Sequence, residues 1–157
     1  MIVACGFDHA GVALRGTLLE LIEAAGHEVL DLGTDSTEAI DYPDKALEVG
    51  SAVVGGQAER GIIVCGSGAG VSVAACKIRG VRAATIHDTY TAHQAVEHDD
   101  VNVLCLGGRV IGVEVAAEIV KAFLGAIVSH EERHLRRRAK VQEMERTGSE
   151  SDELGGR

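Results

Sequence analysis

Short apolar runs alternate along the chain with longer segments whose apolar residues recur at a helical spacing. The short runs are often β-branched and lack a regular polar alternation, as is typical of strands buried on both faces of a parallel sheet. They predict five strands, over residues 2–7, 28–32, 61–65, 83–87 and 101–106. The pattern thus indicates a sheet that is covered on both sides.

The segments between these strands have the spacing of amphipathic helices. The first carries Leu14, Leu18 and Leu21 and is followed by Gly26, a residue that commonly terminates helices. Six helices are predicted, over residues 10–25, 42–55, 70–78, 89–97, 112–128 and 131–146. Residues 147–157 are polar and glycine-rich, so we expect them to form a disordered tail.

The strand–helix unit occurs five times, which predicts an α/β fold with an open, doubly wound (Rossmann-like) five-stranded parallel sheet. Helices on both faces give three layers, α/β/α, and an extra helix follows at the C-terminal side. A closed eight-stranded barrel needs roughly 250 residues, so the length of 157 residues excludes it. We expect one domain over residues 1–146.

Charge and cysteine usage narrow the classes of partner. The formal net charge of −9 disfavours nucleic acid, whose phosphates would be repelled over most of the surface. No signal-peptide pattern opens the chain, and no apolar run approaches the ~18 residues of a membrane span. None of the four cysteines belongs to a C-x-x-C pair. We therefore expect a cytoplasmic protein with free thiols and no membrane partner.

Polar residues follow four of the five predicted strands. They are Asp8 and His9, residues 65–70, His87 and Asp88, and residues 107–109. Ligands of open α/β sheets bind outside the carboxyl ends of the strands. The sequence therefore predicts one functional rim that these residues share.

Residues 65–70 form a glycine-rich loop between a strand and a helix. Gly66, Gly68 and Gly70 alternate there, so backbone N–H groups could converge on an anion. The loop is not a dinucleotide fingerprint, because Val71 stands where that motif needs glycine. It either serves only as a tight turn or forms an oxyanion hole for a developing enolate oxygen.

Cys65 stands at the end of its strand and against the start of a helix, where a thiolate is favoured. A thiolate there could act as a nucleophile or as a proton acceptor. The alternative is a small buried apolar residue, and this is the interpretation that we adopt for Cys5, Cys76 and Cys105.

Asp8 and His98 each have a structural and a functional interpretation. Asp8 could be the N-cap of the following helix, and it could also bind a substrate hydroxyl. His98 lies between Glu97 and Asp99, either as a surface histidine at a helix end or as a proton donor near neutral pH.

Arg133 and Arg137 are four residues apart, so on a helix they share one face. Together they could bind a phosphate, or they could belong to a solvated helix surface. The histidines and carboxylates show no metal-ligand spacing, and H-E-x-x-H is absent from the sequence. We therefore expect no metal site.

These residues, in this order, resemble the type B ribose-5-phosphate isomerases and the related galactose-6-phosphate isomerase subunits. The resemblance covers essentially the whole chain up to the tail. Its motifs are DHAG at 8–11, GT at 33–34, DYP at 41–43, CGSGAG at 65–70, NVL at 102–104, GGR at 107–109, RH at 133–134, and Arg137.

The resemblance implies interconversion of ribose 5-phosphate and ribulose 5-phosphate. Cys65 would be the base that moves a proton between C1 and C2 through an enediolate, and His98 the acid for opening the sugar ring. Asp8 would assist at the hydroxyls. The loop that would stabilise the negative oxygen comprises Gly66, Ser67, Gly68, Ala69 and Gly70.

The resemblance also implies how substrate and subunits are held. Residues that would bind the substrate are His9, Arg109, Arg133 and Arg137, with the last two suited to its phosphate. Sites of the family lie between subunits, so a homodimer or a dimer of dimers is implied. The family uses no metal and no organic cofactor.

One position departs from the family pattern. Asp99 stands where the family usually has asparagine, which adds a negative charge near an anionic substrate. The same chemistry on a hexose 6-phosphate or a tetrose phosphate is therefore the alternative substrate assignment. A third hypothesis is a non-catalytic protein that senses a phosphorylated sugar.

Overall fold

The computed structural model describes the backbone of residues 1–154 and the side chains of residues 1–148. Its strands are β1 (Ile2–Phe7), β2 (Glu28–Asp31), β3 (Arg60–Cys65), β4 (Ala83–Thr85) and β5 (Val103–Gly107). Its helices are α1 (Val12–Ala24), α2 (Tyr42–Val54), α3 (Ala69–Ala75), α4 (Thr89–Asp99), α5 (Val113–Gly125) and α6 (Glu132–Leu154).

The strands form one parallel five-stranded sheet in the order β2-β1-β3-β5-β4. The strands β1 and β3 are neighbours in the sheet. The strand that follows β1 in the chain, β2, lies on one side of this pair, and the strands that follow β3, which are β4 and β5, lie on the other side. The boundary between β1 and β3 is therefore the topological switch point, where open α/β sheets bind their ligands. The predicted doubly wound α/β fold is confirmed.

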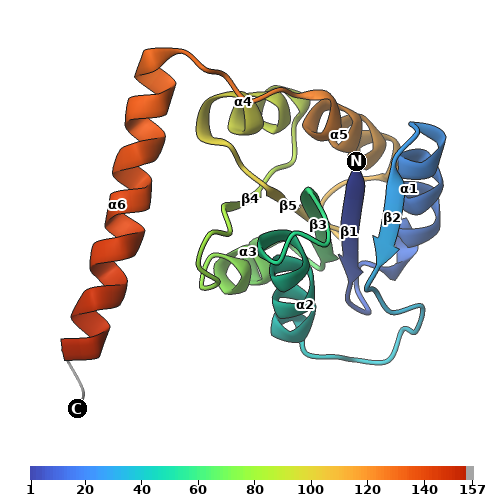
Figure 1. Cartoon of the computed structure of the whole chain (residues 1–157). Coiled ribbons are helices and arrows are strands. Elements are labelled where there is room, and N and C mark those ends of the chain that lie inside the picture. Colours follow the sequence, from blue (N-terminus) through green and yellow to red (C-terminus); the bar gives the residue numbers. More distant parts are fainter. Residues whose placement is uncertain (155–157) are drawn as a thin grey trace.

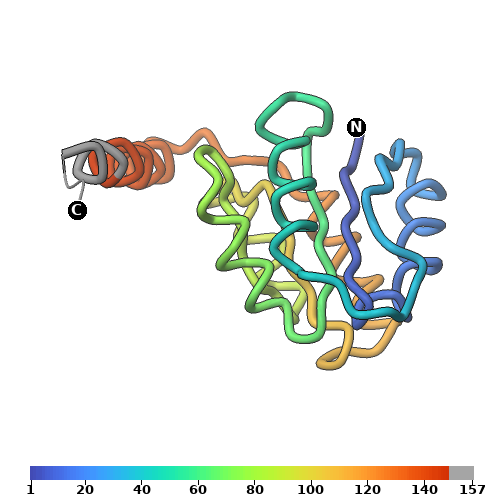
Figure 2. The backbone as a smooth tube through the Cα atoms, turned by 90° about the horizontal axis from the view of Figure 1, so that it is seen from below, coloured from blue at the N-terminus to red at the C-terminus, as the bar shows by residue number. Residues whose placement is uncertain are grey.

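Two apolar cores lie on opposite faces of the sheet. One is built with α1, α4 and α5 and contains Leu18, Ile119 and Phe123, all fully buried. The other is built with α2 and α3 and contains Val49 and Val71. Three layers result, and α6 lies outside them along one side of the molecule (Figures 1 and 2).

Some element boundaries differ from the sequence-based expectation. The strand β4 ends at Thr85 rather than at His87, and β5 begins at Val103 rather than at residue 101. Asp100 adopts a left-handed conformation, with φ 55°, and the chain turns before β5 can begin. Helix α6 continues to Leu154 instead of ending near residue 146, so residues 147–154 of the expected tail are helical. The rest of that tail, 155–157, lies outside the described residues.

None of the helices in the described part of the chain is long and apolar enough to cross a membrane.

Candidate active site

Three loops meet at the carboxyl edge of the sheet, beside the switch point. The Asp8 N–H donates to the Val64 carbonyl at 3.1 Å, and the Gly108 N–H donates to the Cys65 carbonyl at 2.7 Å. The Arg109 N–H donates to the Gly66 carbonyl at 3.1 Å. Backbone hydrogen bonds thus fix the loops after β1, β3 and β5 against one another.

The glycines of these loops allow that close approach. A Cβ on Gly108 would lie 2.8 Å from the Ala10 carbonyl oxygen, and one on Gly107 would lie 2.8 Å from that of Ser67. Both contacts are with backbone, which cannot move aside as a flexible side chain can. The rim therefore excludes side chains where its loops touch.

Cys65 is the buried thiol of this rim, with 5% of its surface exposed. Its Sγ accepts a hydrogen bond from the Gly68 N–H at 3.1 Å. Gly68 has φ 81°, a left-handed conformation that favours glycine. The Thr85 hydroxyl donates to the Gly68 carbonyl at 2.9 Å and holds this turn in place. The loop thus directs a backbone N–H donor at the sulfur.

The other cysteines differ from Cys65. Burial raises the pKa of Cys5 to about 12 and also raises the pKa of Cys105, so both stay protonated thiols in the core. The prediction that Cys76 is buried was wrong, because its side chain is exposed and its Sγ donates to the Ala83 carbonyl at 3.3 Å.

The remainder of the glycine loop lies open at the rim. Ser67 and Ala69 are exposed, and the Ser67 hydroxyl accepts a hydrogen bond from the Ala69 N–H at 3.3 Å. A Cβ on Gly70 would lie 2.9 Å from the Tyr42 ring. Tyr42, the first residue of α2, therefore packs against the loop and forms one wall of the rim.

Asp8 is buried, with 5% of its surface exposed. Its Oδ1 accepts hydrogen bonds from the N–H groups of Ala10, at 2.8 Å, and Gly11, at 3.0 Å. The N-cap of α1 is Gly11, so the prediction of Asp8 as that cap was wrong; the carboxylate stabilises the turn that leads into the helix. The neighbouring His9 accepts a hydrogen bond at Nδ1 from the Ile40 N–H at 3.3 Å.

Arg109 completes what we call the carboxyl-edge group. Its side chain is exposed and lies beside Gly66, where a Cβ would be 3.8 Å from the Arg109 Nη1. The group comprises Asp8, His9, Cys65, Gly66, Ser67, Gly68, Ala69, Gly70 and Arg109. The structure brings together these predicted site residues at one rim.

His98 and Asp99 lie elsewhere, at the end of α4 and therefore at the amino edge of the sheet. The Asn102 N–H just beyond them donates to the carbonyl of Arg82, the residue before β4, at 3.0 Å. The Asn102 carbonyl accepts from the N–H of Gly61, near the start of β3, at 2.8 Å. The end of α4 is thus fixed beside the first residues of the strands.

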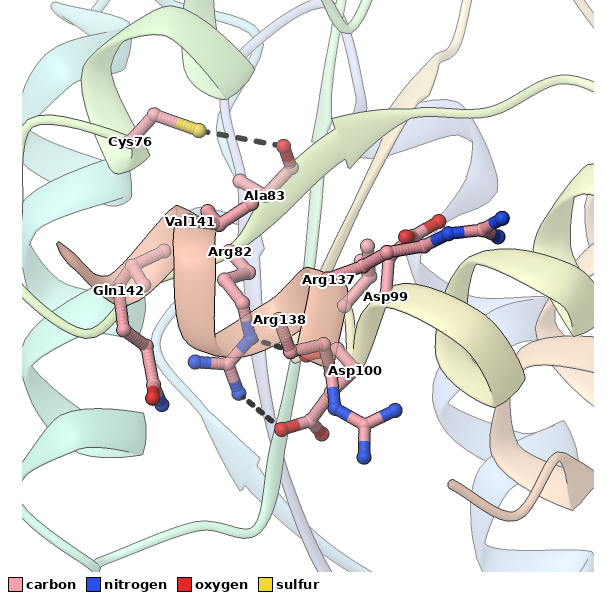
Figure 3. Close-up of a pocket in the computed structure, with 11 residues that line it drawn as sticks. Cys76, Arg82, Ala83, Asp99, Asp100, Arg137, Arg138, Val141 and Gln142 are labelled. Atoms are coloured by element: carbon pink, nitrogen blue, oxygen red, sulfur yellow. Dashed lines mark hydrogen bonds and ion pairs between the residues drawn. The ribbon is translucent and has the colours of Figure 1, made fainter. Parts of the chain in front are cut away.

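Arg133 and Arg137 are on the same side of the molecule as His98. Both are exposed, and Arg133 forms an ion pair with Glu131 at 2.7 Å. Arg137 and Asp99 line a cavity of about 370 Å³ between α6, the end of α4 and the start of β4 (Figure 3). We call His98, Asp99, Arg133 and Arg137 the amino-edge group.

The two groups are separated by the length of the sheet. β5 has five residues, and at about 3.3 Å per residue such a strand spans roughly 16 Å. Within one chain, Cys65 and His98 therefore cannot reach the same sugar. The structure assembles the predicted site as two halves.

The polar pair after β4 has structural roles that the sequence did not reveal. His87 Nε2 accepts a hydrogen bond from the Gly107 N–H at 2.9 Å. Asp88 caps α4 by accepting from the Thr91 N–H at 2.7 Å, a bond that lowers the pKa of Asp88. Thr85, which no motif included, and Tyr42, which belongs to the DYP motif but was given no role at the loop, both contact the loop around Cys65. Among the described residues, no cluster of three or more His, Cys, Asp or Glu side chains is placed to hold a metal.

The fold and the carboxyl-edge group define the class as a parallel α/β protein with a thiol site at its switch point. The family model described as Ribose/Galactose Isomerase matches residues 3–141. The chain belongs to this family of sugar-phosphate aldose–ketose isomerases.

Relatives of known name act on different sugars. Ribose-5-phosphate isomerase B of Escherichia coli is 44% identical over 124 residues, which cover 79% of this chain and 83% of the relative. D-erythrulose-4-phosphate isomerase of Pectobacterium atrosepticum is 41% identical over 125 residues, which cover 79% of this chain and 82% of the relative.

Solved structures agree with this assignment. Ribose-5-phosphate isomerase B of Clostridium thermocellum superposes with a TM-score of 0.90 at 41% identity, over 94% of this chain and 99% of that one. Ribose-5-phosphate isomerase B of Mycoplasma genitalium with bound ribulose 5-phosphate superposes with a TM-score of 0.86 at 36% identity, over 92% of this chain and 96% of that one.

Proposed function

We propose that this protein interconverts ribose 5-phosphate and ribulose 5-phosphate, with Cys65 as the base. The observation that carries the proposal is the Cys65 sulfur at the switch point, with the Gly68 N–H directed at it at 3.1 Å. A sulfur held in this way is suited to accept a proton, and the adjoining loop offers further donors to an oxygen that gains charge.

Ring opening comes first in the proposed mechanism. His98 donates a proton to the ring oxygen while Asp8 accepts the proton of the O1 hydroxyl, which leaves an open-chain aldehyde. Asp8 is suited to this role because the Ala10 and Gly11 N–H groups hold its carboxylate in one orientation.

Proton transfer follows on the open chain. The Cys65 thiolate removes the proton from C2, the electron pair forms a C1–C2 double bond, and the carbonyl oxygen becomes the negative oxygen of an enediolate. The loop at 66–70, including Ser67, stabilises that oxygen. The proton of the C2 hydroxyl passes to the C1 oxygen, Cys65 returns its own proton to C1, and the carbonyl forms at C2.

A dimer would bring the two halves of this site together. Each amino-edge group would meet the carboxyl-edge group of the second copy, so that Arg133 and Arg137 bind the phosphate while His9 and Arg109 hold the rest of the sugar. Two equivalent sites result from one two-fold axis. A dimer of such dimers keeps the same pairing.

Exposed apolar residues support this pairing. Leu47 and Val54 of α2 are 58% and 46% exposed, and Val73 of α3 is 64% exposed. Helix α6 exposes Leu135 and Met144, at 46% and 69%. Apolar surface on elements that flank the two half-sites is suited to burial against a second copy.

The reaction is tested with ribose 5-phosphate and a panel of aldose phosphates, in the presence of a chelator. Cys65→Ser is expected to lower kcat by about 10²–10⁴-fold, the range for a lost general base. Cys5→Ala is the matched control, because Cys5 is a fully buried core thiol within β1 and belongs to neither group of candidate site residues. Unchanged activity in Cys65→Ser would exclude the base, and no turnover of any sugar by the wild type would favour the sensor hypothesis.

The pairing is tested by complementation. Cys65→Ser and His98→Ala homodimers are each expected to keep only a small, measurable residual activity. Unfolding and refolding an equal mixture should restore about a quarter of wild-type activity, because half of the dimers are mixed and each mixed dimer holds one intact site. Failure to recover activity in mixed dimers that form would contradict the shared site.

A tetrose phosphate is the second candidate substrate. Asp99 in place of the family's asparagine and the D-erythrulose-4-phosphate relative both favour it. Asp99→Asn is expected to change the ranking of the sugars in the panel by kcat/KM. An identical ranking in this variant would remove Asp99 as the source of specificity. The cytoplasmic location stays a prediction.

A further inference from the structure

His98 is held by helix α6 as well as by its own helix. The His134 ring of α6 stacks on the His98 ring, with ring centroids 4.1 Å apart and an interplanar angle of 29°. On its own helix, His98 is adjacent to Glu97, whose carboxylate lies 3.7 Å from the His98 Nε2. His134 therefore confines one face of a ring that is otherwise partly open to solvent.

His134 is suited to this contact because it stays uncharged. It is 2% exposed, and burial is the main cause that lowers its pKa. The charges of His98, Arg133 and Arg137 lower the pKa further, and Glu131 opposes them. A neutral ring can stack on His98 in both of its protonation states without repelling the imidazolium.

Arg138 holds the backbone of His98. One guanidinium nitrogen, Nη1, donates to the His98 carbonyl at 3.1 Å, and Nη2 donates to the Ser129 carbonyl at 2.9 Å. The Ser129 N–H in turn donates to the Glu97 carbonyl at 2.8 Å. The end of α4, the segment before α6 and α6 itself are thus joined around His98.

Two adjacent faces of α6 carry residues with different contacts. His134 and Arg138 are four residues apart and share one face, which is turned toward α4. Arg133 and Arg137 are offset by one position and lie on the adjacent exposed face. The same helix can therefore bind an anion with one face while it fixes the neighbouring acid with the other.

We propose that His134 and Arg138 are positioning residues that hold His98 in the orientation for proton donation during ring opening. The inference rests on the proposed function, in which His98 is that acid. Neither residue touches the sugar in this scheme. Helix α6 would then contribute to catalysis as well as to phosphate binding.

The test is a double-mutant cycle on purified, folded dimers with ribose 5-phosphate as substrate. His134→Ala is expected to lower kcat about tenfold at nearly unchanged KM, because a misplaced catalytic group costs rate and not affinity. His134→Phe, which keeps a neutral ring, should stay within about threefold of the wild type. In the His98→Ala background, His134→Ala should cost less than about twofold more, since the partner is already gone.

Arg138 is tested with a matched arginine. Arg138→Gln should lower kcat about tenfold, whereas Arg136→Gln, which removes the same charge from an exposed position of the same helix, should change it by less than about twofold. If His134→Ala does not fold, His134→Leu fills the same space without an aromatic face and carries the same expectation.

Three results would overturn the inference. Wild-type kcat in His134→Ala, while His98→Ala is impaired, would refute positioning alone. Equal losses from His134→Ala in the wild-type and His98→Ala backgrounds would make its effect independent of His98. Full activity of His98→Ala would refute the acid itself, and the inference would fall with that part of the proposed function.

Discussion

The carboxyl-edge and amino-edge groups are built in opposite ways. Cys65 is 5% exposed and its loop is fixed by backbone hydrogen bonds, whereas the Arg133 side chain is 58% exposed and lies on a helix outside the three layers. Proton transfer to and from carbon requires a narrow geometry, and a rigid backbone supplies it. Phosphate binding depends on charge, which long side chains can bring from a less constrained helix.

The contrast predicts that small changes at the carboxyl edge affect rate most. Gly68→Ala places a Cβ at φ 81°, 2.9 Å from Thr85 Cγ2 and 3.1 Å from the Leu106 carbonyl carbon. The turn must shift and move its N–H away from Cys65, so we expect kcat to fall about 10²-fold. Steady-state kinetics on ribose 5-phosphate measure this.

Gly16→Ala is the control for that substitution. Gly16 lies within α1, and among the described residues no atom beyond its chain neighbours and the backbone of its own helix lies within 4 Å of the position of its Cβ. The activity of Gly16→Ala should equal that of the wild type, and the free energy of unfolding of this variant should be higher by about 0.5–1 kcal/mol. Wild-type kcat in Gly68→Ala would show that the N–H is not needed.

The amino edge should respond through affinity. Arg137→Ala is expected to raise KM about 10–100-fold with kcat within about threefold, because one charge-assisted contact to phosphate is lost. Arg136→Ala, on an exposed position next to it, should leave KM unchanged. If kcat of Arg137→Ala fell while KM stayed constant, Arg137 would act in the chemical step. The carboxyl-edge and amino-edge groups would then not differ in the way described.

The smallest expected effect concerns stability in acid. The folded state holds the pKa of His134 below its usual 6.5, so below that pH the unfolded chain binds a proton that the folded chain does not. The free energy of unfolding therefore falls as the pH drops below about 6.5. In His134→Phe, which lacks this titrating group, the fall should be smaller. Urea midpoints at pH 7.5 and 5.5 test this, and equal losses in both proteins would contradict it.

The sequence was a good guide to the elements and a partial guide to the site. Apolar runs located every strand, and β1 has the predicted bounds. The ends of β4 and β5 were not predictable, because they depend on the His87 contact with Gly107 and on the left-handed Asp100. Both are tertiary or conformational details that apolar periodicity does not encode.

The motifs named the residues of the candidate site but not how these residues are divided between the two edges of the sheet. That division follows from chain direction, since the helix after a parallel strand returns to the opposite edge and carries His98 there. The roles of His134 and Arg138 were also missed. Their four-residue spacing was the available signal, but only the packing of α6 on α4 shows what that face contacts.

The placement of Cys65 and His98 at opposite edges would make activity depend on protein concentration. If each site needs two copies, dilution below the dissociation constant of the dimer would abolish turnover while every chain stays folded. An inactive chain would also disable one site in each active partner that it captures. Expression level, as well as sequence, would then set how much of this enzyme works in a cell.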